Sequence, residues 1–234
     1  MKKKYHAIIL ARGGSKGIKN KNIIDFCGKP LLVWTIEQAI QSKYISSIWV
    51  SSDNEKILKL AKHSGAEIIE RPKKFASDTS SSINAYIHAI SYIEKFNSID
   101  SIVALQVTSP IRESIDIDRA ILKFEKFNYD SLFSGAEIGD FYIWKIKNQK
   151  LKSINYNYKK RQRRQDFEKQ YVENGSIYIF KPSVIKKYKN QLGGKIGISL
   201  MDFWKSFEID DNFDLEFCKM IMNNYLLKTL KTRL

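Results

Sequence analysis

Cysteine is scarce in this chain of 234 residues, and long apolar runs are missing. Its two cysteines, Cys27 and Cys218, exclude a disulfide framework and a cysteine metal quartet, so we expect both to be small buried apolar residues. No run approaches the ~20 apolar residues that span a bilayer. The apolar stretch before Arg12 is about six residues long, which is too short for a signal peptide. We therefore expect a cytoplasmic protein without a membrane partner.

Acidic residues are few relative to basic ones, with 25 Asp and Glu against 40 Lys and Arg and a net charge of +15. This imbalance suits a polyanionic partner, whether a nucleic acid, an anionic membrane or a phosphate-bearing substrate. Lysine, isoleucine and asparagine are abundant along the whole chain, as genomes of low GC content tend to produce, so charge alone does not decide among these partners. The hydrophobic content of 43% excludes general disorder, and the length fits one domain.

Short apolar runs alternate with stretches of helical periodicity. We expect strands at 6–10, 45–52, 66–72, 101–107 and 174–182, and helices at 31–43, 54–65, 80–96 and 115–127. This alternation indicates βαβ crossovers and predicts an α/β fold with a mainly parallel sheet flanked by helices. The later part of the chain predicts a hairpin around Asn148 and a strand at 207–210 followed by a helix. We expect a single domain over residues 1–234 with an inserted arm at about 137–172.

The loop at 11–22 follows the first predicted strand and combines Arg12 with three glycines and several lysines. In α/β sheets ligands bind outside the carboxyl ends of the strands, and glycines let backbone amides approach a phosphate. Arg12 offers a bidentate guanidinium, while Lys16 and Lys21 offer point charges. The Walker A pattern fails because Gly17 follows Lys16, and the dinucleotide pattern fails because Arg12 occupies the place of its first glycine. The loop is typical of a phosphate site, with a basic surface turn as the alternative.

Five blocks in order carry a family resemblance. The segment "LARGGSKGIKNKN" resembles the signature of the acylneuraminate cytidylyltransferase family, the CMP-sialic acid and CMP-nonulosonic acid synthetases. The blocks "ERPKKFASDTSSS", "LQVTSPIR", "RRQ…ENGSIYIF" and "SFEIDDNFDL" extend the resemblance over nearly the whole chain. It implies a nucleotide-diphospho-sugar transferase-like, Rossmann-like fold with a dimerisation hairpin at "GDFYIWKIKNQK". It also implies transfer of CMP from CTP to the anomeric hydroxyl of an acidic nine-carbon sugar, with release of pyrophosphate, for glycan synthesis.

The resemblance also implies residues for the nucleotide. Arg71 would meet the cytosine carbonyl and Asn22 the nucleotide sugar, whereas an N-cap cluster before the 80–96 helix is the alternative for Ser77 to Thr79. The catalytic residues would be Arg12, Lys21 and Asp210. The nucleotide-binding residues would be Arg12, Gly13, Ser15, Lys16, Asn22, Arg71, Ala76, Ser77, Ser80 and Ser82.

For the sugar acid the resemblance implies Gln106, Arg164 and Asn174. Arg164 belongs to the basic run at 158–165, for which an RNA-binding or membrane-binding patch is the alternative. Ser109 and Arg112 are weaker candidates, and a turn residue and a surface cation are the alternatives for them.

Glu208 and Asp210 alternate along the last predicted strand, so we expect both carboxylates to project to the same side. Mg²⁺ takes hard oxygen ligands of this kind and completes its shell with phosphates and water. The family usually has Asp-x-Asp here, so Glu208 is a departure. Asp210 and Glu208 are the predicted metal ligands, and Mg²⁺ or another divalent cation is the predicted cofactor. Asp211 and Asp214 resemble the start of the following helix.

Other functions remain open at this point. Within enzymes these are a CMP-Kdo-type synthetase and a nucleotidylyltransferase for a neutral sugar phosphate, and in a different class a basic nucleic-acid-binding protein. Val172 replaces a basic residue common in sialic-acid enzymes, and Lys145 aligns only approximately with the lysine of the family's arm. Both departures favour a related acid such as legionaminic or pseudaminic acid. The expected partners are CTP, the sugar acid and a second copy of the chain, with no nucleic acid.

Overall fold

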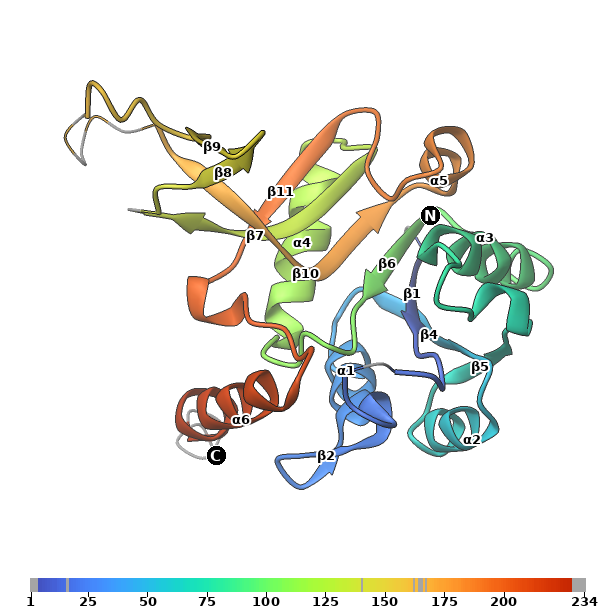
Figure 1. Cartoon of the computed structure of the whole chain (residues 1–234). Coiled ribbons are helices and arrows are strands. Elements are labelled where there is room, and N and C mark those ends of the chain that lie inside the picture. Colours follow the sequence, from blue (N-terminus) through green and yellow to red (C-terminus); the bar gives the residue numbers. More distant parts are fainter. Residues whose placement is uncertain are drawn as a thin grey trace.

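A seven-stranded sheet forms the centre of the molecule (Figure 1). The computed structural model describes residues 4–15, 17–139, 141–161, 163, 166 and 168–228. The strand order is β11-β7-β10-β6-β1-β4-β5, and β10 is antiparallel to both its neighbours whereas the other adjacent pairs are parallel. The strands are β1 (Tyr5–Leu10), β4 (Ile45–Ser52), β5 (Glu67–Glu70), β6 (Ser101–Leu105), β7 (Ser131–Ile138), β10 (Gln170–Phe180) and β11 (Ile196–Leu200). The prediction of a mainly parallel sheet is confirmed.

Helices cover both faces of this sheet. The helices are α1 (Leu31–Ile40), α2 (Glu55–His63), α3 (Ser82–Ile93), α4 (Ser114–Lys126), α5 (Pro182–Tyr188) and α6 (Asn212–Ile221). Successive side chains of a strand point to opposite faces, so Ala7 and Ile9 of β1 pack with α1, α2, α4 and α6, while Ile8 packs with α3 and α5. The two apolar clusters therefore form one layer on each side of the sheet.

Capping side chains set several of the helix ends. Asn54 accepts hydrogen bonds from the backbone amides of Lys56 and Ile57 at the start of α2, and Gly65 follows that helix at φ 91°. Capping boxes open α4 and α6, the second through Asp211 and Asp214. The expectation for these two aspartates is confirmed.

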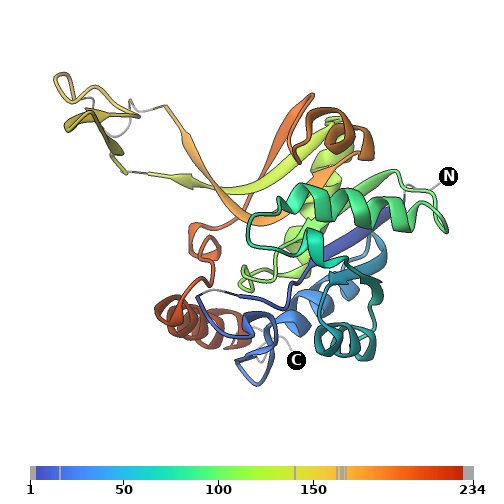
Figure 2. The same ribbon diagram turned by 45° about the vertical axis from the view of Figure 1, so that its right-hand side comes forward.

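A two-stranded hairpin, β8 (Trp144–Lys147) and β9 (Lys150–Ser153), projects from the body between β7 and β10 (Figure 2). Asn148 and Gln149 have φ angles of 51° and 59°, as a two-residue hairpin turn of the right twist requires. The predicted hairpin around Asn148 is confirmed. Its apolar side chains alternate with lysines along the strands.

Some predictions of local structure are wrong. The segment 207–210 is not a strand: it follows the short helical turn η4 (Phe203–Lys205) and makes a backbone hydrogen bond from Ile209 to Thr108 rather than a ladder. Ser81, not the 77–79 cluster, caps α3. The prediction that both cysteines are buried holds for Cys218, while Cys27 is half-buried.

The sequence prediction also omitted several elements: β7, β11, α5 and the short pair β2 (Asp25–Phe26) and β3 (Lys29–Pro30). None of the helices in the part of the chain that the structure describes is long and apolar enough to cross a membrane.

Candidate functional site

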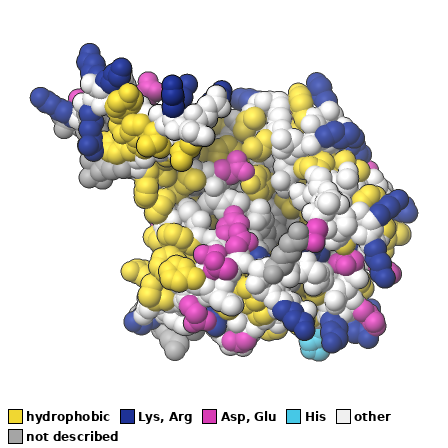
Figure 3. Space-filling view, viewed as in Figure 1, with side chains coloured by type: hydrophobic (Ala, Val, Ile, Leu, Met, Phe, Trp, Pro, Cys, Tyr) yellow, Lys and Arg dark blue, Asp and Glu magenta, His cyan; other side chains and the backbone are white. Residues whose placement is uncertain are grey.

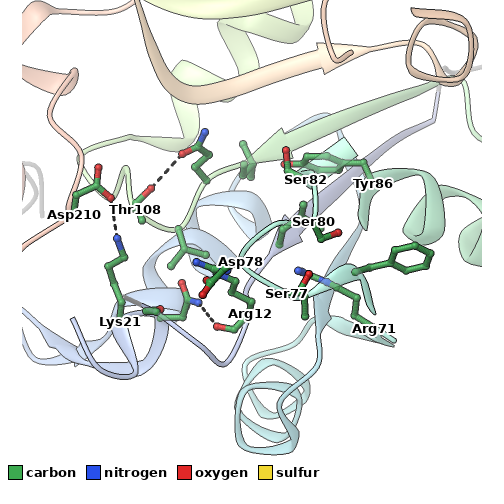
Figure 4. A pocket seen from close by; sticks show the side chains of 18 of the residues that line it. Arg12, Lys21, Arg71, Ser77, Asp78, Ser80, Ser82, Tyr86, Thr108 and Asp210 are labelled. Carbon is green, nitrogen blue, oxygen red and sulfur yellow. Dashed lines mark hydrogen bonds and ion pairs between the residues drawn. The ribbon is translucent and has the colours of Figure 1, made fainter. Parts of the chain in front are cut away.

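A cavity of about 640 Å³ lies at the carboxyl ends of β1 and β6 (Figure 4). Its walls come from the Gly-rich loop, the 71–82 segment, the end of β6 and the segment before α6. It brings together many of the predicted residues: Arg12, Ser15, Lys21, Asn22, Arg71, Ala76, Ser77, Ser80, Ser82, Gln106 and Asp210. It also contains residues that the sequence prediction did not include, among them Tyr86, Thr108 and Gln191.

Backbone and side-chain contacts fix the Gly-rich loop. The amide of Gly13 donates to Asp53 Oδ1 over 2.9 Å, and the buried Asn22 donates from Nδ2 to the carbonyl of Arg12 over 2.8 Å. A Cβ on Gly13 would lie 2.8 Å from the side chain of Asn54, and one on Gly17 would meet the backbone carbonyl of Asp210. Gly13 and Gly17 are therefore needed for close packing of the loop as well as for access of a phosphate to its backbone amides.

Two ion pairs cross the cavity from the loop. Arg12 Nη1 lies 2.8 Å from Asp78 Oδ1, and Lys21 Nζ lies 2.9 Å from Asp210 Oδ1 and 2.8 Å from the carbonyl of Ile209. The Arg12 and Asp78 side chains stay 34% and 49% exposed, so an incoming anion can compete for the guanidinium. A second cavity of about 300 Å³ lies between Arg12, Asp53 and Asp78.

Arg71 follows β5 and is buried. Its guanidinium donates to Ser51 Oγ over 3.1 Å and to the carbonyl of Ser51. Burial lowers the pKa of Arg71, and the nearby Asp53 opposes that shift. Ser80 Oγ is buried beside it without a hydrogen-bond partner among the described residues. An oriented cation and a hydroxyl without a partner suit the recognition of a polar ring.

Gln106 lines the cavity directly after the end of β6. Its Oε1 accepts a hydrogen bond from Thr108 over 3.2 Å. Gly175, at φ 67°, packs so closely against Glu208 and Gln106 that a Cβ would overlap the Glu208 carboxylate. Glu208 therefore lies beside Gln106, although 102 positions separate them in the sequence.

Asn174 does not line either cavity. It is buried within the sheet, where its Oδ1 accepts from Ser134 Oγ over 2.5 Å and from the amide of Ser176 over 3.2 Å. Arg112 is also buried and donates to the carbonyl and hydroxyl of Ser176 over 2.8 and 3.0 Å. The alternative of a surface cation for Arg112 is wrong, because the side chain joins the end of β6 to β10.

Glu208 and Asp210 flank the buried Ile209; Asp210 is exposed and lines the cavity, whereas Glu208 is half-buried against Gly175. Burial raises the pKa of Glu208, and the like charge of Asp210 raises it further, whereas a hydrogen bond to Thr108 lowers it. A divalent cation would relieve the repulsion, so the pair fits Mg²⁺. Among the described residues no third His, Cys, Asp or Glu joins them, so phosphate and water would supply the remaining ligands.

Two predicted residues, Lys16 and Arg164, lie outside the described residues. Of the residues missed by the sequence prediction, Asp53 carried a usable signal, because it directly follows a predicted strand at the edge where ligands bind. Gln191 lies on the connection between α5 and β11 and carried no signal, since its approach to Tyr86 depends on tertiary packing.

A family model and relatives of similar sequence agree on one family. A family model described as cytidylyltransferase matches residues 6–232. The chain is 36% identical to N-acylneuraminate cytidylyltransferase A of Danio rerio over 89% of its length, and it spans about half of that relative, 48%. It is 34% identical to pseudaminic acid cytidylyltransferase of Campylobacter jejuni subsp. jejuni, covering 92% of this chain and 94% of the relative. A CMP:2-keto-3-deoxy-manno-octonic acid synthetase solved with CTP superposes with a TM-score of 0.71 at 16% identity, covering 94% of this chain and 98% of that one, which supports the fold.

Proposed function

The chain belongs to the cytidylyltransferase family, and from that premise we propose that it transfers CMP from CTP to the anomeric hydroxyl of a nonulosonic acid and releases pyrophosphate. The acceptor would be of the sialic, legionaminic or pseudaminic acid type. The observation that carries this proposal is the single cavity in which Arg71, the Gly-rich loop, Gln106 and Asp210 meet, with Lys21 of the loop next to Asp210. Its volume of about 640 Å³ lies in the range of small-molecule sites.

The nucleotide would occupy the end of the cavity near Arg71. The guanidinium of Arg71 and the hydroxyl of Ser80 would meet polar atoms of the cytosine, and the hydroxyls of Ser77 and Ser82 lie on the same wall. The triphosphate would lie along the loop between Arg12 and Lys21. Asn22, which donates a hydrogen bond to the carbonyl of Arg12, would stabilise the loop conformation and face the ribose.

The acceptor would occupy the end near Gln106. In this arrangement the anomeric hydroxyl would attack the α-phosphate: the new P–O bond forms as the bond to pyrophosphate breaks, and the hydroxyl proton is lost to solvent. Arg12 and Lys21 would neutralise the charge that develops on the departing pyrophosphate, and the fixed walls would align the reactants. The described histidines do not lie in the cavity wall, so no covalent nucleophile pair is part of the proposal.

Asp210 and Glu208 would hold the divalent cation. When bound, this cation would polarise the phosphate and lower the pKa of the attacking hydroxyl. Without it, Lys21 keeps the Asp210 carboxylate at the cavity wall through the 2.9 Å ion pair. We also propose that the protein acts in the cytoplasm and as a homodimer through the β8–β9 hairpin.

Pyrophosphate release tests the proposal. The purified protein is incubated with CTP and Mg²⁺ against a panel of sialic, legionaminic and pseudaminic acids together with Kdo. We expect release with one or more nonulosonic acids and none without Mg²⁺. Release with Kdo alone would assign the chain to the Kdo-type reaction, and failure of CTP to bind in calorimetry would contradict the proposed function itself.

A further inference from the structure

Glu173 has no part in the reaction as proposed, and it lies near enough to Glu208 for the two carboxylates to interact. It precedes the buried Asn174 in β10, and its own side chain is exposed. The phenol of Tyr178 donates a hydrogen bond to Glu173 Oε1. Burial raises the pKa of Tyr178, and the Glu173 carboxylate raises it further, so the phenol keeps its proton and acts as the donor.

The strand register places this carboxylate on the face of the sheet that carries Gln106. Tyr178 lies opposite Ala104 of β6, and Gln106 follows two positions later, so both side chains project to the same face. Tyr178 also packs in the same apolar cluster as Tyr86, and both Tyr86 and Gln106 line the cavity. The hydrogen bond from Tyr178 therefore holds the Glu173 carboxylate near Glu208, which lies beside Gln106.

The chain around Gly175 brings β10 into contact with Glu208 and Gln106. The pairing of β10 with β7 shifts register between Glu173 and Tyr178, and Gly175 within that interval packs against Glu208 and Gln106. Glu173 and Glu208 both lie near enough to Tyr178 to raise its pKa. Glu173 thus adds a negative charge on the β10 side, next to that of Glu208, which is one of the proposed metal ligands.

The Glu173 carboxylate favours one kind of substituent on the acceptor. An ionised carboxylate has several acceptor positions, of which the phenol takes one. A cationic N–H donor would form a charge-assisted hydrogen bond there, which is about twice as strong as a neutral one. The carboxylate of the acceptor itself would be repelled, so its opposite end would face Glu173.

We propose that Glu173 is a specificity-determining residue that favours acceptor acids bearing a cationic nitrogen substituent, an ammonium or amidinium group, over their neutral acylamino analogues. This inference rests on the proposed function and names a subclass of acceptor within it. Tyr178 acts as the positioning residue, because it holds the Glu173 carboxylate at the wall.

The test compares two acids that differ in one group, an acetamidino-substituted nonulosonic acid and its acetamido analogue. With CTP and Mg²⁺, the native protein is expected to use the cationic acid roughly tenfold better in kcat/KM, as the loss of a charged hydrogen bond implies. Glu173→Gln is expected to remove that preference and to leave the KM for CTP unchanged. Tyr178→Phe, which keeps the ring, is expected to reduce the preference in part.

Glu137→Gln is the matched control. Glu137 lies on the same face of the neighbouring strand β7, two positions beyond the partner of Glu173, and pairs with Lys169 over 3.0 Å. The control is expected to keep the native preference. An equal effect of Glu173→Gln on the two acids, or a control that loses the preference as well, would overturn the inference.

Binding measurements separate this inference from the proposed function. Calorimetry of the two acids, with and without CTP, gives the same comparison if turnover is too slow to measure. Equal binding of both acids to the native protein would overturn the assignment of Glu173. Absence of CTP binding would instead contradict the cytidylyltransferase reaction, whatever the acids do.

Discussion

At the scale of single residues, the pairing of Lys21 with Asp210 joins the Gly-rich loop to the segment before α6. The Asp210 side chain is 77% exposed and lines the cavity, while Lys21 is only 13% exposed. The carboxylate is therefore held at the cavity wall by a cation that is itself fixed. An exposed carboxylate held in this way adds little to the stability of the fold, and its main effect is to place a negative charge at the cavity wall.

We expect Asp210→Asn to lower kcat/KM for CTP by at least about 100-fold, because it removes a charged group from the reacting end of the cavity. Its free energy of unfolding should change by less than about 1 kcal/mol, because the side chain is largely exposed. Pyrophosphate release and urea unfolding measure the two effects. Asp202→Asn, at another exposed position on the same segment, is the control, and equal activity of both variants would contradict the prediction.

The ion pair between Arg12 and Asp78 competes with the triphosphate for the same guanidinium. We expect Asp78→Asn to tighten CTP binding by up to about fivefold, because a half-exposed ion pair is worth less than about 1 kcal/mol. Calorimetric titration with CTP at low and moderate salt measures the change. Glu94→Gln, which breaks the half-exposed pair with Lys186 just after α3, at the end of that helix away from Ser82, should leave the affinity unchanged. Weaker binding by Asp78→Asn would show that Asp78 supports the nucleotide.

Two of the predicted residues that line the cavity lie at strand ends. Arg12 lies two positions after β1 and Gln106 directly follows β6, and the carboxyl ends of parallel strands meet at one edge of a sheet. Asn174 and Arg112 could not be placed in this way. Their hydrogen bonds to Ser134 and Ser176 join strands far apart in the sequence, and no local pattern reports such pairing.

At the scale of elements, Lys205 joins the η4 turn to the start of α4. Its Nζ lies 2.7 Å from both Glu113 and Asp116, and the side chains of Lys205 and Asp116 are each 3% exposed. Burial acts to lower the pKa of Lys205, but the two carboxylates outweigh it and raise that pKa. The turn that precedes Glu208 is thereby fixed to a helix end.

We expect Lys205→Met to destabilise the protein by about 3–5 kcal/mol, because it leaves the buried Asp116 charge without its partner. Lys181→Met, which breaks the more exposed pair with Asp130, should cost less than about 1 kcal/mol. Urea unfolding of both variants measures the difference. Equal destabilisation would mean that the Lys205 cluster is no stronger than a surface pair.

Elements with strong periodicity were predicted closely, as the agreement of 45–52 with β4 shows. β7 and β11 were missed because "SLFSGAEI" and "IGISL" mix small and polar residues with the apolar ones. Their strand form comes from pairing with each other and with β10. The segment 207–210, in contrast, was predicted as a strand and is not one. Its alternating pattern arises because Ile209 is buried between two polar residues, and the segment does not pair in a sheet.

At the scale of the whole molecule, the sheet order brings distant segments to one hollow. The Gly-rich loop, the end of β6 and the segment before α6 meet because β1 and β6 are neighbours in the sheet. In the view of Figure 3, Lys and Arg side chains are spread around the rim of the molecule, whereas acidic side chains gather beside the central hollow. On the face shown, this distribution accords with a small-molecule site rather than with a basic surface for nucleic acid.

The β8–β9 hairpin has an exposed apolar face that favours contact with a partner. Trp144, Ile146 and Leu151 share one face of the ribbon and are 38%, 74% and 68% exposed, while lysines such as Lys145 and Lys152 occupy the opposite face. An isolated two-stranded hairpin is only marginally stable in water. A second copy that covered the apolar face would bury these side chains and stabilise the ribbon.

We therefore expect the native protein to be a dimer in solution and the double variant Ile146→Asp with Leu151→Asp to be a monomer, because two buried charges would oppose the contact. Light scattering coupled to size exclusion measures the mass. The control is Lys147→Asp with Lys150→Asp, which places the same charges on the opposite face and should remain dimeric. A double variant that stays dimeric would move the interface elsewhere, and a monomeric native protein would remove the homodimer from the proposal. If the monomer forms but keeps full activity, the hairpin serves assembly and does not complete the site of its neighbour.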